Sequence, residues 1–178
     1  MRIVLRIFGI IAVLVAVGMG ALTVNRNFED AKDAKEMATT IEQYQKDVAT
    51  MKEQVKAMSG DEATAMNEEI AKAEKMLDIP SPGTFTFIGV LMAVLVIVSL
   101  ISAVFLFKAG HKIAVILLGV AVIAGLAAIV ISPNISTEYG PASNRTLSIV
   151  VTIPAVIAAF FAFVMRNGKK PAQVNNMA

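Results

Sequence analysis

The chain has 178 residues, of which 56% are hydrophobic and 17% are charged, and its mean hydropathy is +0.69. This composition excludes an ordinary soluble domain and is typical of an integral membrane protein. The sequence contains no cysteine and a single histidine, His111, so disulfides, thiolate metal sites and cysteine nucleophiles are excluded. We therefore predict a protein that is not an enzyme and has no catalytic residue, no cofactor and no metal site.

The first long apolar run is Ile3 to Thr23, with Arg2 and Arg6 at its start. A helix of this length spans about 30 Å, which is the thickness of a bilayer core. The basic start and the small residues before Ala21 also fit a cleavable signal peptide. We interpret residues 1–23 as a retained membrane-spanning helix, similar to an uncleaved signal anchor.

Residues 24–84 form a polar segment with apolar residues spaced alternately by three and four. This spacing is the seam of a coiled coil. The turn Ser59-Gly60-Asp61 divides it, and we predict an antiparallel coiled-coil hairpin in which Ile70 packs near Val48 and Met51, with Asp61 capping the second helix. The sequence Ile79-Pro80-Ser81-Pro82-Gly83 should end that helix and serve as a linker. The seam positions are Ala34, Met37, Ile41, Tyr44, Val48, Met51, Val55 and Met58, followed by Ala63, Met66, Ile70, Ala73 and Leu77.

Three further apolar runs follow, at Phe85 to Phe107, Ile113 to Ile131 and Leu147 to Met165. Pro154 lies inside the last run and should kink it. The predicted fold class is therefore an all-α integral membrane protein, a bundle of four transmembrane helices with the hairpin between the first and the second. Residues 85–165 complete the bundle, and residues 166–178 form a basic cytoplasmic tail that we expect to be disordered.

Charge predicts the orientation. Four spans place both termini and the turn at residues 108–112 on one side of the membrane, and the positive-inside rule makes that side cytoplasmic. Residues 24–84, with 8 basic and 13 acidic residues, and residues 132–146 would then be periplasmic or extracellular, and we expect a bacterial inner membrane. The basic residues on the predicted cytoplasmic side are Arg2, Arg6, Lys108, Lys112, Arg166, Lys169 and Lys170.

The interiors of the four runs contain no ionisable residue, which argues against a coupled transporter. We expect the hydroxyls of Ser99, Ser102, Ser148 and Thr152 to bond to their own backbone, and His111 to be a solvated turn residue. Methionines in the hairpin could in principle bind copper, but at seam positions they favour packing. Two sites match the glycosylation acceptor pattern, at Asn134 and Asn144.

Small residues recur every four positions in the first run and suit close helix approach. We favour packing within the bundle as their role, with an intermolecular interface as the alternative. The seam of the first hairpin helix next to the membrane has no helical partner of equal length, and the linker with Ile79 is the alternative cover for it. The candidate interaction face is Ala12, Ala16, Gly20, Ala34, Met37 and Ile41.

The predicted function is a non-enzymatic scaffold, structural or assembly subunit that associates through the hairpin and the first membrane helix. Expected partners are membrane lipid and either a second copy or another subunit, with no nucleic acid and no small-molecule substrate identified. The alternatives are a transmembrane sensor that couples the hairpin to the first membrane helix, or an uncoupled oligomeric pore.

Overall fold

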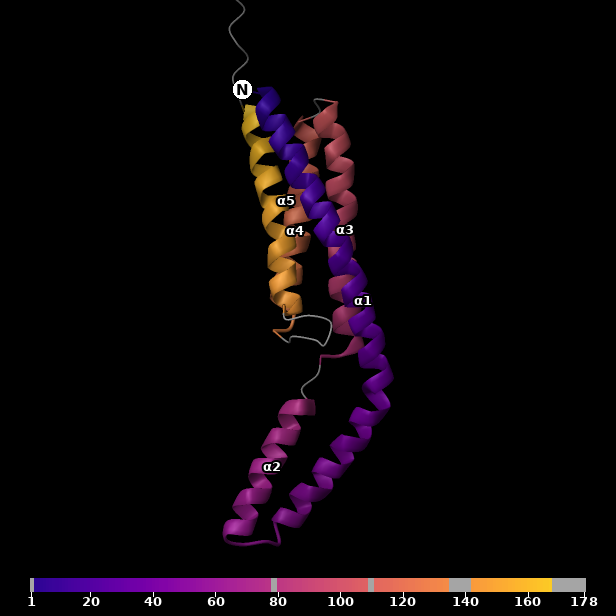
Figure 1. Cartoon of the computed structure of the whole chain (residues 1–178), viewed down its shortest axis with the longest axis vertical. Helices are drawn as coiled ribbons and strands as arrows, with labels where there is room; N and C mark the ends of the chain where they lie inside the picture. Colours follow the sequence, from indigo (N-terminus) through magenta and orange to yellow (C-terminus); the bar gives the residue numbers. More distant parts are fainter. Residues whose placement is uncertain (1, 78–79, 109–110, 135–141, 168–178) are drawn as a thin grey trace, which may run out of the picture. The chain divides into compact units, whose positions relative to one another are not determined.

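The structure, a computed structural model, describes residues 2–77, 80–108, 111–134 and 142–167. These residues form five α-helices and no strand (Figure 1). Four of the helices are long and apolar enough to cross a membrane, which indicates an integral membrane protein. The predicted tail beyond residue 167 and Ile79 lie outside the described residues. The helices are α1 (Arg2–Val55), α2 (Asp61–Leu77), α3 (Pro82–Phe107), α4 (His111–Ile131) and α5 (Asn144–Asn167).

The α1 helix is continuous over 54 residues and includes Asn25 and Asn27, whose residue type has a lower helix propensity than alanine or leucine. No proline interrupts this part of the sequence, and the Thr23 hydroxyl donates a hydrogen bond to the carbonyl oxygen of Met19 at 3.0 Å. The chain divides into two compact units, a first unit of residues 1–26 and 88–178 and a second unit of residues 27–87.

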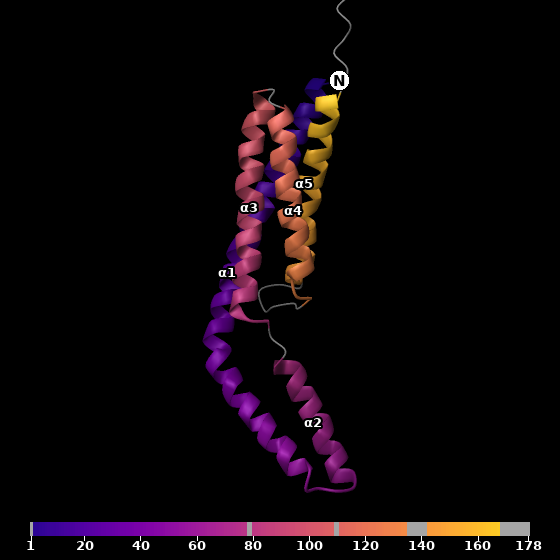
Figure 2. The ribbon, with the colours of Figure 1, turned by 180° about the vertical axis from the view of Figure 1, so that it is seen from behind.

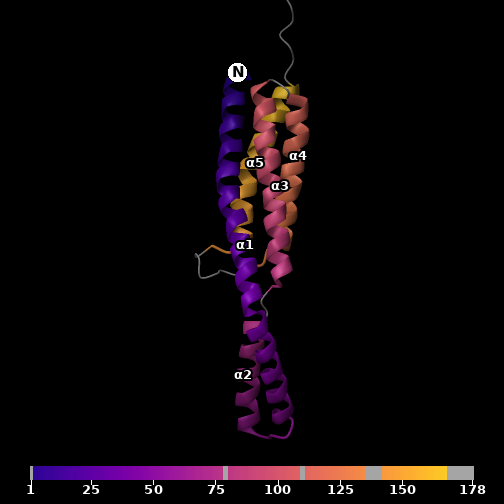
Figure 3. The ribbon, with the colours of Figure 1, turned by 90° about the vertical axis from the view of Figure 1, so that its right-hand side faces the viewer.

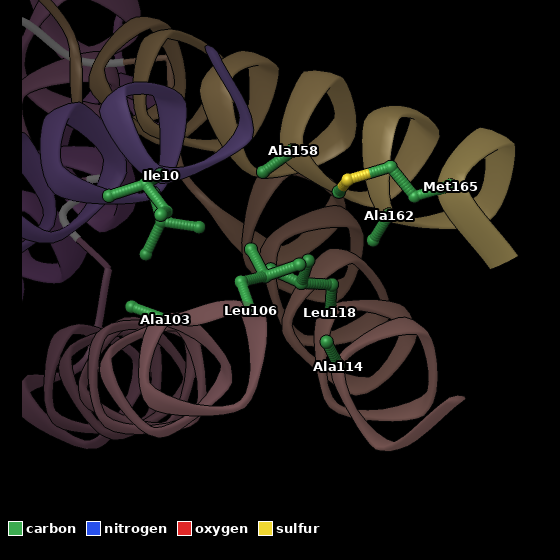
Figure 4. Close-up of a cluster of buried hydrophobic side chains, with 9 residues drawn as sticks. Ile10, Ala103, Leu106, Ala114, Leu118, Ala158, Ala162 and Met165 are labelled. Atoms are coloured by element: carbon green, nitrogen blue, oxygen red, sulfur yellow. The ribbon is translucent and has the colours of Figure 1, made fainter. Parts of the chain in front are cut away.

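Four helices supply the core of the first unit. One cluster joins α1 to α3, α4 and α5, and the side chains of Ile10, Leu106 and Leu118 point into its interior (Figure 4). A second cluster contains Met92 and Leu95 of α3 with several small residues of α4. Because many of the core residues are alanines, the helices can approach closely. The side chains that point outward from the bundle are mostly large and apolar, as contact with lipid requires.

The two ends of the first unit differ in which segments they gather. The N-terminal ends of α1 and α4 and the C-terminal ends of α3 and α5 lie at one end, and the C-terminal end of α4 and the N-terminal end of α5 lie at the other (Figures 1 and 2). The first of these ends carries the described basic residues Arg6, Lys108, Lys112 and Arg166.

In the second unit, α2 lies beside the C-terminal part of α1 (Figure 3). Val48 of α1 and Ile70 of α2 are both buried, and the Lys52 ammonium contacts the Glu74 carboxylate between the two helices at 2.5 Å. Gly60 precedes α2 with a φ of +79°, a left-handed conformation that glycine adopts without steric penalty.

Two helices begin three residues earlier than the apolar runs suggest, because of their capping residues. Pro82, a residue of the predicted linker, starts α3, since a first-turn proline gives up no helical hydrogen bond. The Thr84 amide donates to the Ser81 hydroxyl at 3.3 Å, and the Thr146 amide donates to the Ser143 hydroxyl at 3.2 Å at the start of α5. The α5 helix continues through Pro154.

Candidate functional site

Metal-ligating side chains do not gather in the part of the chain that the structure describes. Among the described residues, no group of three His, Cys, Asp or Glu side chains could hold a metal ion. His111 is the first residue of α4 and is half-buried. It is therefore a helix residue with partial solvent access and not the solvated turn residue that we expected. Met37 and Met51 are exposed, whereas Met58 and Met66 are half-buried.

The small residues of α1 in the candidate face pack inside the first unit. Ala16 is fully buried, and Ala12 packs against the core that includes Ile10 and Val13. A Cβ atom added to Gly20 would lie 2.5 Å from Val96 Cγ2 of α3 and 3.4 Å from Val151 Cγ1 of α5. These three positions therefore serve close packing of helices within one chain, the role that the sequence favoured for them.

The other members of the candidate face differ from one another in exposure. Ala34 is buried in a cluster with Ala31 and Phe85, so the first turn of α3 supplies its cover. Ile41 is half-buried, whereas the Met37 side chain is 49% exposed. The structure thus leaves Met37 as the only one of the six positions with a largely exposed apolar side chain.

The predicted seam of α1 divides into two rows. One row, at Ala34, Ile41, Val48 and Val55, is buried or half-buried. The other row, Met37, Tyr44 and Met51, repeats every seven residues and is 49%, 59% and 38% exposed. We call these three residues the outer row. Residues seven apart lie on one face of a helix, with a drift of about 20° per repeat. Sequence spacing alone could not find this division, because both rows obey the same heptad pattern.

Polar side chains border the outer row. Tyr44 lines a hollow of about 260 Å³ together with Thr40, Gln43 and Asp47. An apolar row with a polar margin is the usual composition of a helix–helix contact in water, where charged or polar neighbours select the partner.

A second polar cluster closes the end of the first unit at the connection between α4 and α5. The Ser132 and Ser148 hydroxyls are 3.0 Å apart, and the Arg26 guanidinium donates to the carbonyl oxygen of Ala142 at 2.9 Å. Ser143 donates to the Asn134 side-chain oxygen at 3.2 Å. These bonds fix the start of α5 against α1 and α4. Asn144 is 1% exposed, so it is inaccessible as a glycosylation acceptor in this conformation.

Of the four hydroxyls that we expect to bond to their own backbone, two do so, whereas the buried Ser99 hydroxyl has no hydrogen-bond partner among the described residues. Ser102 donates to the carbonyl oxygen of Ser99 at 2.7 Å, and Thr152 donates to that of Ser148 at 2.7 Å. Such local bonds satisfy the hydroxyl within its own helix. Ser148 differs, because its hydroxyl pairs with Ser132 of the loop after α4.

No family model, curated protein or solved structure matches this chain. Function is therefore inferred from the residues themselves. Two surfaces stand out, the outer row on α1 in the second unit and an apolar groove between α4 and α5 in the first.

Proposed function

We propose that this protein is a non-enzymatic membrane scaffold or assembly subunit. In this proposal, α1, α3, α4 and α5 form a four-span bundle, and α1 and α2 form a coiled-coil hairpin outside the cytoplasm. The hairpin binds a helix of another subunit, which is a second copy of this chain or a different membrane protein.

The outer row of α1 carries the proposal. Three large side chains repeat at the heptad period and remain exposed while the parallel row of the same seam is buried or half-buried. In water, a helix normally buries such a stripe against a partner, because each large apolar side chain gains about 1.5–3 kcal/mol on full burial. The row thus fits a contact to a further helix on the side that α2 leaves open.

The hairpin itself is supported by burial and charge. Val48 and Ile70 are 7% and 4% exposed, although most of the surrounding side chains are exposed. The Lys52–Glu74 contact adds a bond between the helices, but such half-exposed pairs contribute little to stability. Apolar burial at Val48 and Ile70 is therefore the main support for pairing of α1 with α2.

The proposed orientation rests on the basic end of the first unit. Arg6, Lys108, Lys112 and Arg166 gather there, so the positive-inside rule assigns that end to the cytoplasm. The connection between α4 and α5 then faces the periplasm or the exterior. The same charge distribution fits a bacterial inner membrane.

A transmembrane sensor is the second candidate. The observation in its favour is that α1 is one uninterrupted helix that contributes to both units. A partner bound at the outer row would then act on the helix that also packs in the bundle. The uncoupled pore has no comparable support, because the hydroxyls of Ser102 and Thr152 are satisfied locally.

The test places two positive charges in the outer row. The chain and the variant Tyr44→Lys with Met51→Lys are purified in mild detergent, and the protein mass of each complex is measured by light scattering. Lysine is a good helix former, so α1 should persist while burial against a partner becomes unfavourable. We expect the unmodified chain to form a defined complex and the variant to lose it.

The matched control is Thr39→Lys with Thr50→Lys, which adds the same charge at two exposed positions on another face of α1. The control should keep the complex. The scaffold proposal fails if the outer-row variant keeps the same protein mass and the same stoichiometric partner as the unmodified chain. It also fails if the unmodified chain is a monomer with no stoichiometric partner.

A further inference from the structure

An apolar groove lies between α4 and α5 on the outer surface of the first unit. Its volume is about 220 Å³. The rim is exposed, with Leu126 and Ile153 each 51% exposed. Thr152 is the one hydroxyl in the lining, and its hydrogen bond to the Ser148 carbonyl oxygen leaves an apolar surface for a ligand. The lining residues are Leu126, Ile129, Ile149, Thr152, Ile153, Val156 and Ile157.

The groove covers only part of the length of α4 and α5. Its α4 residues lie near the C-terminal end of that helix, and its α5 residues extend from Ile149, near the start of α5, to Ile157, just past the middle of α5. The distance along α5 from Arg145 to Ile157 is about 18 Å. Half of a bilayer core is about 15 Å thick. The groove thus matches the depth of a single lipid leaflet.

A cation lies close to this groove, one helical turn before the first α5 residue of its lining. Arg145 is exposed, lies in the first turn of α5 and is one turn before Ile149, so both residues are on the same helix face. It forms no ion pair with any residue of the described ranges. A guanidinium binds phosphate with two parallel hydrogen bonds, and the positive end of the helix dipole adds to the attraction.

We propose that this groove is a binding site for one anionic phospholipid. The phosphate of the headgroup pairs with Arg145, and one acyl chain lies along the groove between α4 and α5. A transmembrane helix of a second copy would need contacts over the full span of about 30 Å, whereas the groove covers one leaflet. The positive charge of Arg145 and the length of the groove therefore favour a lipid over a helix of a second copy.

The experiment measures lipids that stay bound to the purified full chain. The protein in mild detergent is equilibrated with phosphatidylglycerol and phosphatidylcholine of identical acyl chains, and native mass spectrometry counts the lipids retained per chain. We expect one phosphatidylglycerol per chain. Arg145→Gln should lower the preference for phosphatidylglycerol about fivefold, the ratio that corresponds to about 1 kcal/mol for one cation at the membrane surface.

A second variant tests the groove without touching the charge. Val156→Trp fills the groove and should reduce the retention of both lipids. Two controls should behave like the unmodified chain: Arg166→Gln, which removes a cation from the other end of α5, and Ile123→Trp, which adds bulk at an exposed position of α4 outside the groove.

The lipid proposal is overturned if retention is unchanged in Val156→Trp, or if the preference for phosphatidylglycerol is unchanged in Arg145→Gln. It is also overturned if Val156→Trp lowers the oligomeric mass without changing the lipid count, because the groove would then hold a second copy. The residues tested differ from those of the outer row, so this site and the scaffold proposal can fail separately.

Discussion

At the scale of single residues, the bundle depends on how little space some positions leave. Gly125 of α4 faces α5, and a Cβ atom added there would meet the Thr152 side chain, with Cγ2 at 2.8 Å, and Leu95 Cδ1 at 3.0 Å. Gly119, six residues earlier on the same helix, would meet nothing within 4 Å. The two glycines look alike in the sequence but differ in what a methyl group would displace.

We predict that Gly125→Ala destabilises the bundle by about 1–3 kcal/mol, because the branched Thr152 side chain is held by its bond to Ser148 and cannot easily yield. Gly119→Ala is the control and should be neutral or stabilise by up to about 1 kcal/mol through helix propensity. The measurement is the temperature at which half of the detergent-solubilised protein is lost from the monodisperse peak in size-exclusion chromatography. Equal temperatures for both variants would contradict close packing of α4 on α5 at Gly125.

At the scale of elements, the proposed pairing of α1 with α2 rests on few buried side chains. The α2 helix has 17 residues, and Ile70 is its one buried large side chain among those described. An isolated helix of this length is marginal in water, so tertiary contact must stabilise it. Ile70 is therefore the position where one substitution should separate the two helices.

Ile70→Asp should destabilise the hairpin by about 2–5 kcal/mol, because it removes a buried side chain and places a charge where an apolar contact was. We expect residues 56–77 to be cleaved much faster in limited proteolysis. Asn67→Asp, which adds the same charge at an exposed position of α2, should leave the cleavage rate unchanged. If Ile70→Asp is as protease-resistant as the unmodified chain, α1 and α2 do not pair through this residue.

At the scale of the whole molecule, orientation decides which surfaces meet which compartment. The proposed orientation places the basic end of the first unit in the cytoplasm and residues 56–60, between α1 and α2, on the opposite side of the membrane. The absence of native cysteine allows this assignment to be tested without background labelling.

Single cysteines at Ser59, Lys108 and Asn167, all exposed positions, report the topology. An impermeant thiol reagent added to intact cells should label Ser59→Cys. It should label Lys108→Cys and Asn167→Cys only after the membrane is permeabilised. The reverse pattern would contradict both the orientation and the placement of the hairpin outside the cytoplasm.

The sequence by itself determined the class of protein and the positions of its helices. Runs such as Ile113 to Ile131 are long and uncharged, so they identify membrane spans without knowledge of any neighbour. The helix ends predicted from the sequence were less accurate, because Pro82 and Ser143 act through local capping effects that a hydropathy pattern does not register. The heptad spacing from Ala34 to Met58 similarly predicted helix and seam but not which row of the seam is covered.

Only the tertiary structure decided which of these positions are available to a partner. Ala16 and Gly20 have the spacing of an intermolecular contact, yet neighbouring helices of the same chain bury them, whereas Met37, Tyr44 and Met51 remain exposed. The groove beside Arg145 arises from the packing of α4 on α5 and has no signature in either helix alone. Periodicity is a property of one helix, but exposure depends on every helix packed around it, and the one-dimensional pattern does not contain those neighbours.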